Sequence, residues 1–191
     1  MDTRILAAIL IAVVVLVVVA VLLTMRKRKS EQVRSHYGPE YERALQQHGD
    51  ARRAEAALLQ REKRVEKFSI RPLPAEERQR YMEDWAAVQR RFVDDPALAI
   101  TEADQLVTFV MAARGYPMVD FEQRAADISV HYPGVVQNYR FARQIVLRNG
   151  EGQSTTEDLR QAMIYFRSLF EELLTSPTAQ RTGATYERLA S

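Results

Sequence analysis

Three side chains capable of acid–base chemistry fall on one face of a predicted short helix. Arg124, Asp127 and His131 are spaced at i, i+3 and i+7, and Glu122 lies in the same segment. Side chains at these intervals are neighbours on a helix surface, and together they form a weak candidate for a polar binding patch or an acid–base site. The paired carboxylates of acid–base catalysis and a nucleophile with its own base are both missing. An exposed ion pair is therefore the favoured interpretation, and an acid–base site is the alternative.

The other sequence motifs of catalysis and ligand binding do not occur. There is no cysteine, and His36, His48 and His131 have no second histidine at the i+3 or i+4 spacing of helical zinc ligands. The Gly-Glu-Gly turn at residues 150–152 precedes a predicted helix but lacks the lysine of a P-loop, and no Gly-x-Ser-x-Gly motif is present. We therefore predict no enzymatic activity, no catalytic residue, no metal and no cofactor, and we identify no small-molecule substrate.

The elements that must position these side chains form a predicted compact bundle of about five helices at residues 69–175. Apolar residues recur there at helical spacing between breaks rich in Pro, Gly and Asn, and no segment alternates at the period of a strand. The first of these helices has one apolar stripe that must be buried. The stripe consists of Tyr81, Trp85, Val88 and Phe92. The polar residues 176–191 are predicted to form a flexible tail.

Side chains that cap helices mark where three of these helices begin. Asp95 is a predicted N-cap, Asp120 is followed by Gln123 three positions later, and Ser154 is followed by Glu157. A short polar side chain at the N-cap satisfies a free backbone N–H group of the first turn. The connections between the helices of the bundle are expected to be short.

Residues 26–68 are predicted to form a basic juxtamembrane helical stalk. Breaks at Gly38-Pro39 and Gly49-Asp50 divide it, and its last part, residues 51–68, has high helix propensity. The apolar residues of that part fit a heptad repeat only if Arg61 occupies a core position. A charged, solvated helix is therefore favoured, and self-association through the stalk is the alternative.

The amino-terminal region is dominated by an apolar run. Residues 5–23 are nineteen consecutive Ile, Leu, Val and Ala residues. As a helix, this run reaches across most of the roughly 30 Å hydrocarbon core of a bilayer. It is longer than the apolar core of a cleaved signal peptide and lacks a small-x-small cleavage site. We therefore predict a single-pass transmembrane anchor over residues 1–25, with the lipid bilayer as a partner.

A basic cluster follows the run and predicts the orientation of the anchor. It consists of Arg26, Lys27, Arg28 and Lys29. Only Arg4 precedes the run, and basic residues beside a span resist translocation. The soluble domain is therefore expected in the cytoplasm, at the inner (plasma) membrane, with the amino terminus outside. An exported protein of inverted topology is the alternative. We interpret the cluster as a topological stop rather than a lipid head-group site.

Charge is distributed unevenly along the chain. Residues 26–68 carry 12 basic and 7 acidic side chains, whereas residues 69–191 carry 14 basic and 17 acidic ones. The basic surplus thus lies beside the predicted anchor, where it favours an anionic lipid surface. The distal region lacks the surplus typical of nucleic-acid-binding domains, so no nucleic-acid partner is expected.

Several short motifs between residues 70 and 174 resemble those of a family of uncharacterised bacterial membrane-anchored helical proteins. They are Arg-Pro-Leu-Pro-Ala-Glu-Glu-Arg at 71–78, Phe-Val-Asp-Asp-Pro at 92–96, Glu-Ala-Asp-Gln-Leu-Val at 102–107, Arg-Gly-Tyr-Pro at 114–117 and Asp-Phe-Glu-Gln-Arg-Ala-Ala-Asp at 120–127. The resemblance implies a bacterial source, but no activity and no site residue.

The sequence thus predicts an all-α protein in which a transmembrane helix, a helical stalk and a compact bundle follow one another. The expected function is that of a membrane-anchored interaction or scaffold protein that binds another protein or itself. A membrane-bound enzyme with a polar site between helices is the alternative from a different class.

Overall fold

The computed structural model describes residues 3–175, with side chains at residue 10 and at residues 12–175. Over this range the chain forms eight α-helices and no strand, which confirms the predicted all-α fold. The predicted flexible tail, residues 176–191, lies outside the described residues. The helices are α1 (Thr3–Tyr37), α2 (Pro39–His48), α3 (Ala51–Val65), α4 (Ala75–Asp94), α5 (Pro96–Ala113), α6 (Phe121–His131), α7 (Pro133–Gly150) and α8 (Thr156–Thr175).

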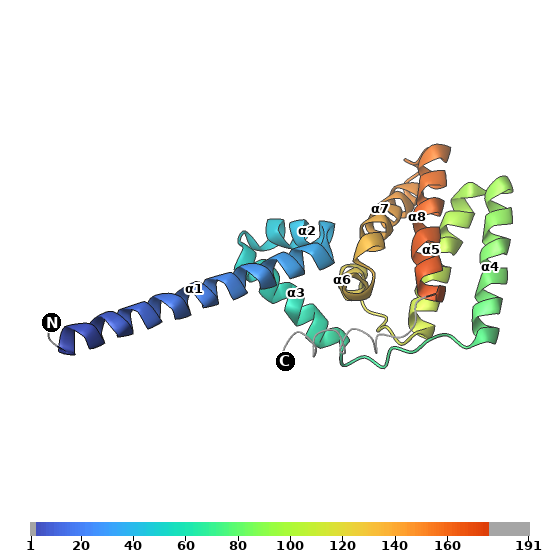
Figure 1. Ribbon diagram of the computed structural model, residues 1–191. Coiled ribbons are helices and arrows are strands. Elements are labelled where there is room, and N and C mark those ends of the chain that lie inside the picture. The colour runs from blue at the N-terminus through green and yellow to red at the C-terminus, as the bar shows by residue number, and fades with distance from the viewer. Residues whose placement is uncertain (1–2, 176–191) are drawn as a thin grey trace.

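The helices form two packed units and one projecting arm (Figure 1). Most of α1 extends away from the rest of the molecule, and its carboxyl-terminal end packs with α2. We call residues 30–65, from this end of α1 through α3, the N-terminal hairpin. Helices α4 to α8 form the second unit, the bundle. The hairpin lies against the bundle where α3 contacts α6 and α2 contacts α7.

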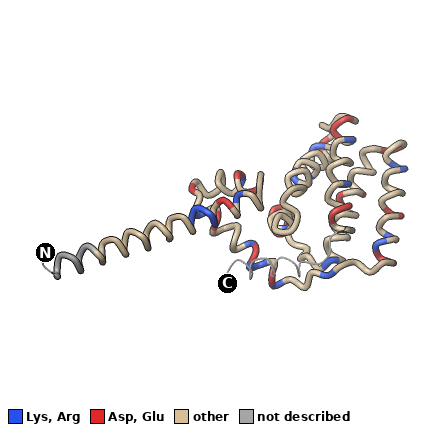
Figure 2. Tube along the Cα trace, in the orientation of Figure 1, with Lys and Arg blue, Asp and Glu red and all other residues tan. Residues whose placement is uncertain are grey.

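Helix α1 is an unbroken helix of 35 residues that carries the apolar run into the hairpin. The large apolar side chains described between residues 10 and 25 are 46% to 70% exposed. The basic cluster lies further along the same helix, where Figure 2 shows a blue band as α1 reaches the hairpin. The chain then turns at Gly38, and Pro39 is the first residue of α2, as its fixed φ favours.

The predicted transmembrane helix is not supported by the described residues. The side chains at positions 5–9 and 11 of the apolar run lie outside them. The described side chains from residue 12 to residue 25 form a stretch of 14 residues before the basic cluster, whereas a spanning helix needs about 20. Within the described part of the chain, no helix is both long enough and apolar enough to cross a membrane.

The segment interpreted as a stalk folds back on itself and builds a small apolar core. On α3, Ala54 and Leu58 are fully buried, and they pack with Tyr37, Tyr41 and Ala44 from the two preceding helices. The apolar face that partly fits a heptad repeat is therefore covered within the chain.

The bundle has the larger core, to which all five of its helices contribute. Three residues of the predicted stripe on α4, Tyr81, Trp85 and Val88, are buried, and Phe92 is partly buried against the same core. The indole of Trp85 stacks on the ring of Phe170 in α8, with centroids 4.7 Å apart. This stacking joins the first and last helices of the bundle.

Two of the three predicted N-caps are confirmed. A carboxylate oxygen of Asp95 accepts a hydrogen bond from the Leu98 backbone N–H at 3.0 Å. The carboxylate of Asp120 accepts one from the Gln123 N–H, also at 3.0 Å. Each carboxylate satisfies a backbone donor that the first helical turn leaves free.

The third predicted cap is wrong by one residue. Thr155 rather than Ser154 precedes α8, and its hydroxyl accepts from the Asp158 N–H at 3.1 Å. The Asp158 carboxylate accepts in return from the Thr155 N–H at 2.9 Å. Ser154 instead donates to the carbonyl of Ile145 at 3.2 Å, which fixes the loop to α7.

Residues 66–74 connect the hairpin to the bundle: a turn at residues 66–68 is followed by residues 69–74, which have no regular secondary structure and lie against the end of α5. The Arg71 N–H donates to the carbonyl of Arg114 at 2.9 Å. Gly115 adopts a φ of 95°, and a Cβ added there would overlap the carbonyl group of Ser69. Only glycine combines this backbone angle with so close an approach.

Candidate functional site

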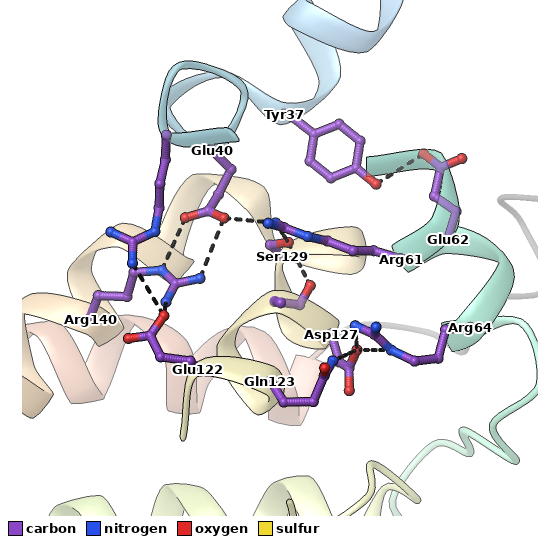
Figure 3. Close-up of polar contacts among 12 residues, drawn as sticks. Tyr37, Glu40, Arg61, Glu62, Arg64, Glu122, Gln123, Asp127, Ser129 and Arg140 are labelled. Atoms are coloured by element: carbon purple, nitrogen blue, oxygen red, sulfur yellow. Dashed lines mark hydrogen bonds and ion pairs between the residues drawn. The ribbon is translucent and has the colours of Figure 1, made fainter. Parts of the chain in front are cut away.

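The N-terminal hairpin and the bundle have separate apolar cores, and charged side chains join them (Figure 3). At the centre of this contact, Glu40 of α2 is fully buried. Arg140 of α7 donates from Nε to one oxygen of Glu40 at 3.1 Å, and Arg61 of α3 donates to the other oxygen at 3.1 Å. One carboxylate thus ties three helices together. We call this contact the polar joint. It comprises Glu40, Arg61, Arg64, Glu122, Asp127 and Arg140.

The outer edge of the polar joint is an exposed carboxylate. Glu122 of α6, with 63% of its side chain exposed, accepts from Nη1 of Arg140 at 2.5 Å. Arg43 of α2 donates to the same carboxylate oxygen at 3.2 Å. The guanidinium of Arg140, only 5% exposed, therefore lies between a buried and an exposed carboxylate.

The second half of the polar joint links α3 to α6. Asp127 is 2% exposed and accepts two hydrogen bonds from Arg64, one of them from Nε at 2.8 Å. The side-chain amide of Gln123 donates to the same carboxylate at 3.0 Å. Nearby, the Tyr37 hydroxyl donates to Glu62 at 3.0 Å. The Arg64–Asp127 pair crosses from the hairpin to the bundle, whereas the other two hydrogen bonds each lie within one unit.

The chemistry of the polar joint is that of a structural contact. Buried charges are costly to desolvate, and they are retained where each one is paired and hydrogen-bonded. Here Glu40 and Asp127 each face a guanidinium in a geometry that a shift of the hairpin along the bundle would break. Apolar cores alone tolerate such a shift more easily, because their attraction is not directional.

The structure gives each residue of the predicted polar patch a different partner. Asp127 binds Arg64, as described above. Arg124 donates from Nε to the Tyr139 hydroxyl at 3.2 Å and to the Val119 carbonyl at 3.3 Å. The side chains that the sequence places on one face thus take part in three separate contacts with other parts of the fold.

The third residue of that patch is held in a partly buried hydrogen bond. Nδ1 of His131 lies 2.7 Å from the hydroxyl of Tyr116. Burial, the nearby Arg114 guanidinium and His36 lower the pKa of His131 to about 4. Burial also raises the pKa of Tyr116. Near neutral pH the pair is therefore an uncharged imidazole and a phenol.

The basic cluster lies beside a cleft between α1 and the amino-terminal half of α3. The cleft has a volume of about 660 Å³. Its basic side chains come from both helices, whereas Arg28 does not line it. The lining residues are Arg26, Lys27, Lys29, Ser30, Ala51, Arg52, Glu55, Ala56 and Leu59.

The polar joint was not predicted from the sequence. In the sequence, Glu40 is an acidic residue in the first turn of a predicted helix, where it complements the helix dipole. Its partner Arg140 lies 100 positions away. One signal was present, because Arg61 fits the apolar register of α3 and is indeed on its covered side, with 12% of its side chain exposed.

Comparisons with protein-family models, curated proteins and solved structures find no match to this chain. The resemblance to bacterial membrane-anchored proteins therefore stays a prediction. In the described part of the chain, no group of three or more His, Asp and Glu side chains is arranged to hold a metal ion.

Proposed function

We propose that this chain is a single-pass membrane protein whose α1 helix anchors a rigid helical interaction module at the cytoplasmic face. The observation that carries the proposal is the exposed apolar surface of α1. Large apolar side chains between residues 10 and 25 are exposed on all sides of a helix that projects from the fold (Figure 1). A helix that is apolar all round is stable only when an apolar medium or a protein core surrounds it.

Lipid is favoured over a protein groove as that medium. A helix that docks in a groove has one apolar face and one polar face, whereas the run from residue 5 to residue 23 has no polar side chain. The basic cluster directly after it suits the interface between lipid and water, and it favours the cytoplasmic side for the rest of the chain.

The polar joint supports a role in presenting the bundle to a partner. Because α1 continues into the hairpin and the hairpin is ion-paired to the bundle, the bundle has a defined position relative to the anchor. The bundle also has a cleft of about 370 Å³ between α7 and α8, where Phe141 and Tyr165 lie among charged side chains such as Arg148 and Asp158. Aromatic side chains with a polar rim are typical of protein-binding surfaces.

Cell fractionation tests the anchor. The full chain is expected to remain in membranes after an alkaline carbonate wash, and a chain that begins at Arg26 is expected in the aqueous fraction. A reporter active on only one side of the membrane, fused after Ser191, is expected to work in the cytoplasm. Recovery of the full chain in the aqueous fraction would contradict the anchor, and an active reporter on the outside would reverse the orientation.

The interaction role has its own test. The full chain extracted in detergent is expected to copurify with a partner protein or to form an oligomer. A monomer that copurifies with no other protein would contradict this role and leave the anchor standing.

A further inference from the structure

The cleft between α1 and α3 gathers positive charge from two separate parts of the chain. Arg26, Lys27 and Lys29 come from α1, and Arg52 comes from the first turn of α3. The sequence shows only the α1 residues as a cluster, because Arg52 is brought to them by the fold of the hairpin. The first turn of α3 is capped by Asp50, whose carboxylate accepts from the Arg53 N–H at 2.9 Å, so the positive charge of the cleft comes from these four side chains.

These cations are available to bind a ligand. None of the four cations Arg26, Lys27, Lys29 and Arg52 takes part in an ion pair among the described residues. Arg53, by contrast, pairs with Asp50 at 3.2 Å. Glu55 is the acidic residue in the lining, and it already accepts hydrogen bonds from the Ser30 hydroxyl at 2.5 Å and from the Tyr41 hydroxyl at 3.3 Å.

The cleft combines this charge with an aliphatic surface. Ala51, Ala56 and Leu59 of α3 line it together with the cations. Arg26 directly follows Met25, the last residue of the exposed apolar part of α1. The contacts Ser30–Glu55 and Tyr37–Glu62 show that α3 runs parallel to α1, away from its apolar part. A ligand that fits the cleft is therefore anionic at the cations and apolar on the side of Met25, which a free phosphate ion is not.

We propose that this cleft binds the phosphate head group of one anionic phospholipid. The inference rests on the proposed membrane anchor, which places Arg26 at the level of the head groups. The four cations bind the phosphate, and the acyl chains extend in the opposite direction along the helix, beside Met25 and the exposed apolar part of α1. Three residues of the cluster then have a binding role in addition to stopping translocation, namely Arg26, Lys27 and Lys29.

Native mass spectrometry of the full chain in detergent tests the proposal. Equal amounts of phosphatidylglycerol and phosphatidylcholine with identical acyl chains are added, and the lipids retained by each variant are counted. The wild-type chain is expected to retain one phosphatidylglycerol in preference to phosphatidylcholine. Arg52→Gln is expected to reduce that preference about fivefold, the contribution of one basic residue near an anionic lipid.

Two neighbouring residues provide matched controls. Arg53→Gln removes the same charge from the same turn of α3 but lies outside the cleft lining, and it is expected to leave the preference unchanged. Arg26→Gln and Arg28→Gln form a second pair on α1, in which only Arg26→Gln is expected to reduce it. Equal losses within either pair would overturn the site, because they would show a diffuse effect of charge.

Two further outcomes would also overturn the inference. Equal retention of both lipids by a wild-type chain that stays in carbonate-washed membranes would refute the cleft and leave the anchor intact. Binding of glycerol phosphate as tightly as phosphatidylglycerol would show that a soluble anion, rather than a lipid, is the ligand. Loss of the wild-type chain from the membrane fraction would instead refute the proposed anchor, so the two failures are distinguishable.

Discussion

Glu40 shows how a single buried carboxylate can determine the arrangement of helices that are distant in sequence. It is fully buried between the guanidinium groups of Arg61 and Arg140. Removing one partner of a buried ion pair leaves the remaining charge without compensation, at a cost of roughly 3–5 kcal/mol. The contribution of Glu40 to stability is therefore expected to exceed that of the exposed charges around it.

Glu40→Gln is expected to lower the free energy of unfolding by about 3 kcal/mol, because it keeps the shape of the side chain and removes its charge. Urea unfolding of the full chain in detergent measures the change. Glu122→Gln is the matched control, since it contacts the same Arg140 from a 63% exposed side chain, and its effect is expected to stay below about 1 kcal/mol. Equal effects of the two variants would contradict the assigned role of burial.

His131 predicts a pH dependence of stability. Its pKa is lowered to about 4 in the folded chain, against about 6.5 in an unfolded one. Between these values the unfolded chain binds a proton that the folded chain does not, so this contribution to stability is complete above about pH 6.5 and is lost as the pH falls towards 4. The loss is about 3 kcal/mol.

The measurement is urea unfolding at pH 7 and at pH 4.5, with the wild-type chain and His131→Gln compared at both values. Other groups titrate in this range in both proteins, so the difference between the two isolates the histidine. The wild-type chain is expected to lose more stability than the variant. A variant that loses as much as the wild-type chain would show that His131 is protonated equally easily in the folded state.

At the scale of the helix and its ends, local signals predict well because the interactions are local. Asp95 and Asp120 cap the helices that the sequence assigns to them, since a cap depends only on the next three residues. The prediction of the third cap was wrong because two hydroxyl residues, Ser154 and Thr155, are adjacent in the sequence. The tertiary bond from Ser154 to Ile145 decides between them, and sequence spacing does not reveal it.

A substitution at Gly115 tests how closely the end of α5 contacts the linker, residues 66–74. Gly115→Ala is expected to destabilise the chain by about 2–4 kcal/mol, because the new Cβ is strained at a φ of 95° and overlaps the Ser69 carbonyl. Gly134→Ala is the control, since it lies in α7 with open space around it. Thermal unfolding is expected to show a lower midpoint for Gly115→Ala and no loss for Gly134→Ala. Equal midpoints would contradict the tight approach.

At the scale of the whole molecule, the sequence predicts the helical content and the five-helix bundle better than it predicts how the parts fit together. Helix periodicity is a property of neighbouring residues, whereas the polar joint pairs Arg64 with Asp127 and Arg140 with Glu40 over long separations. The hairpin was interpreted as a solvated stalk for the same reason. Its partners on α6 and α7 are far away in sequence.

Hydrogen exchange tests whether the Arg64–Asp127 pair holds α3 against α6. Arg64→Gln leaves Asp127 buried with a weaker partner, so exchange in α3 and α6 is expected to speed up by about tenfold or more. Exchange in α8, which packs mainly on α7 and α5, is expected to stay slow. Arg53→Gln, on the same helix but exposed, is the control and is expected to change neither region. Uniform acceleration over all helices would mean that hairpin and bundle unfold as one cooperative unit.

Helix α1 runs without interruption from its exposed apolar part into the hairpin. The number of residues between Met25 and Tyr37 therefore determines the direction in which the bundle faces around the α1 axis. An α-helix advances about 100° and 1.5 Å per residue. One residue inserted after Met25 therefore rotates the bundle by about a quarter turn around this axis. Seven inserted residues restore its direction and move it by about 10 Å along the axis. After the seven-residue insertion the bundle would still face a partner of fixed position, but it would lie too far along the axis to contact that partner.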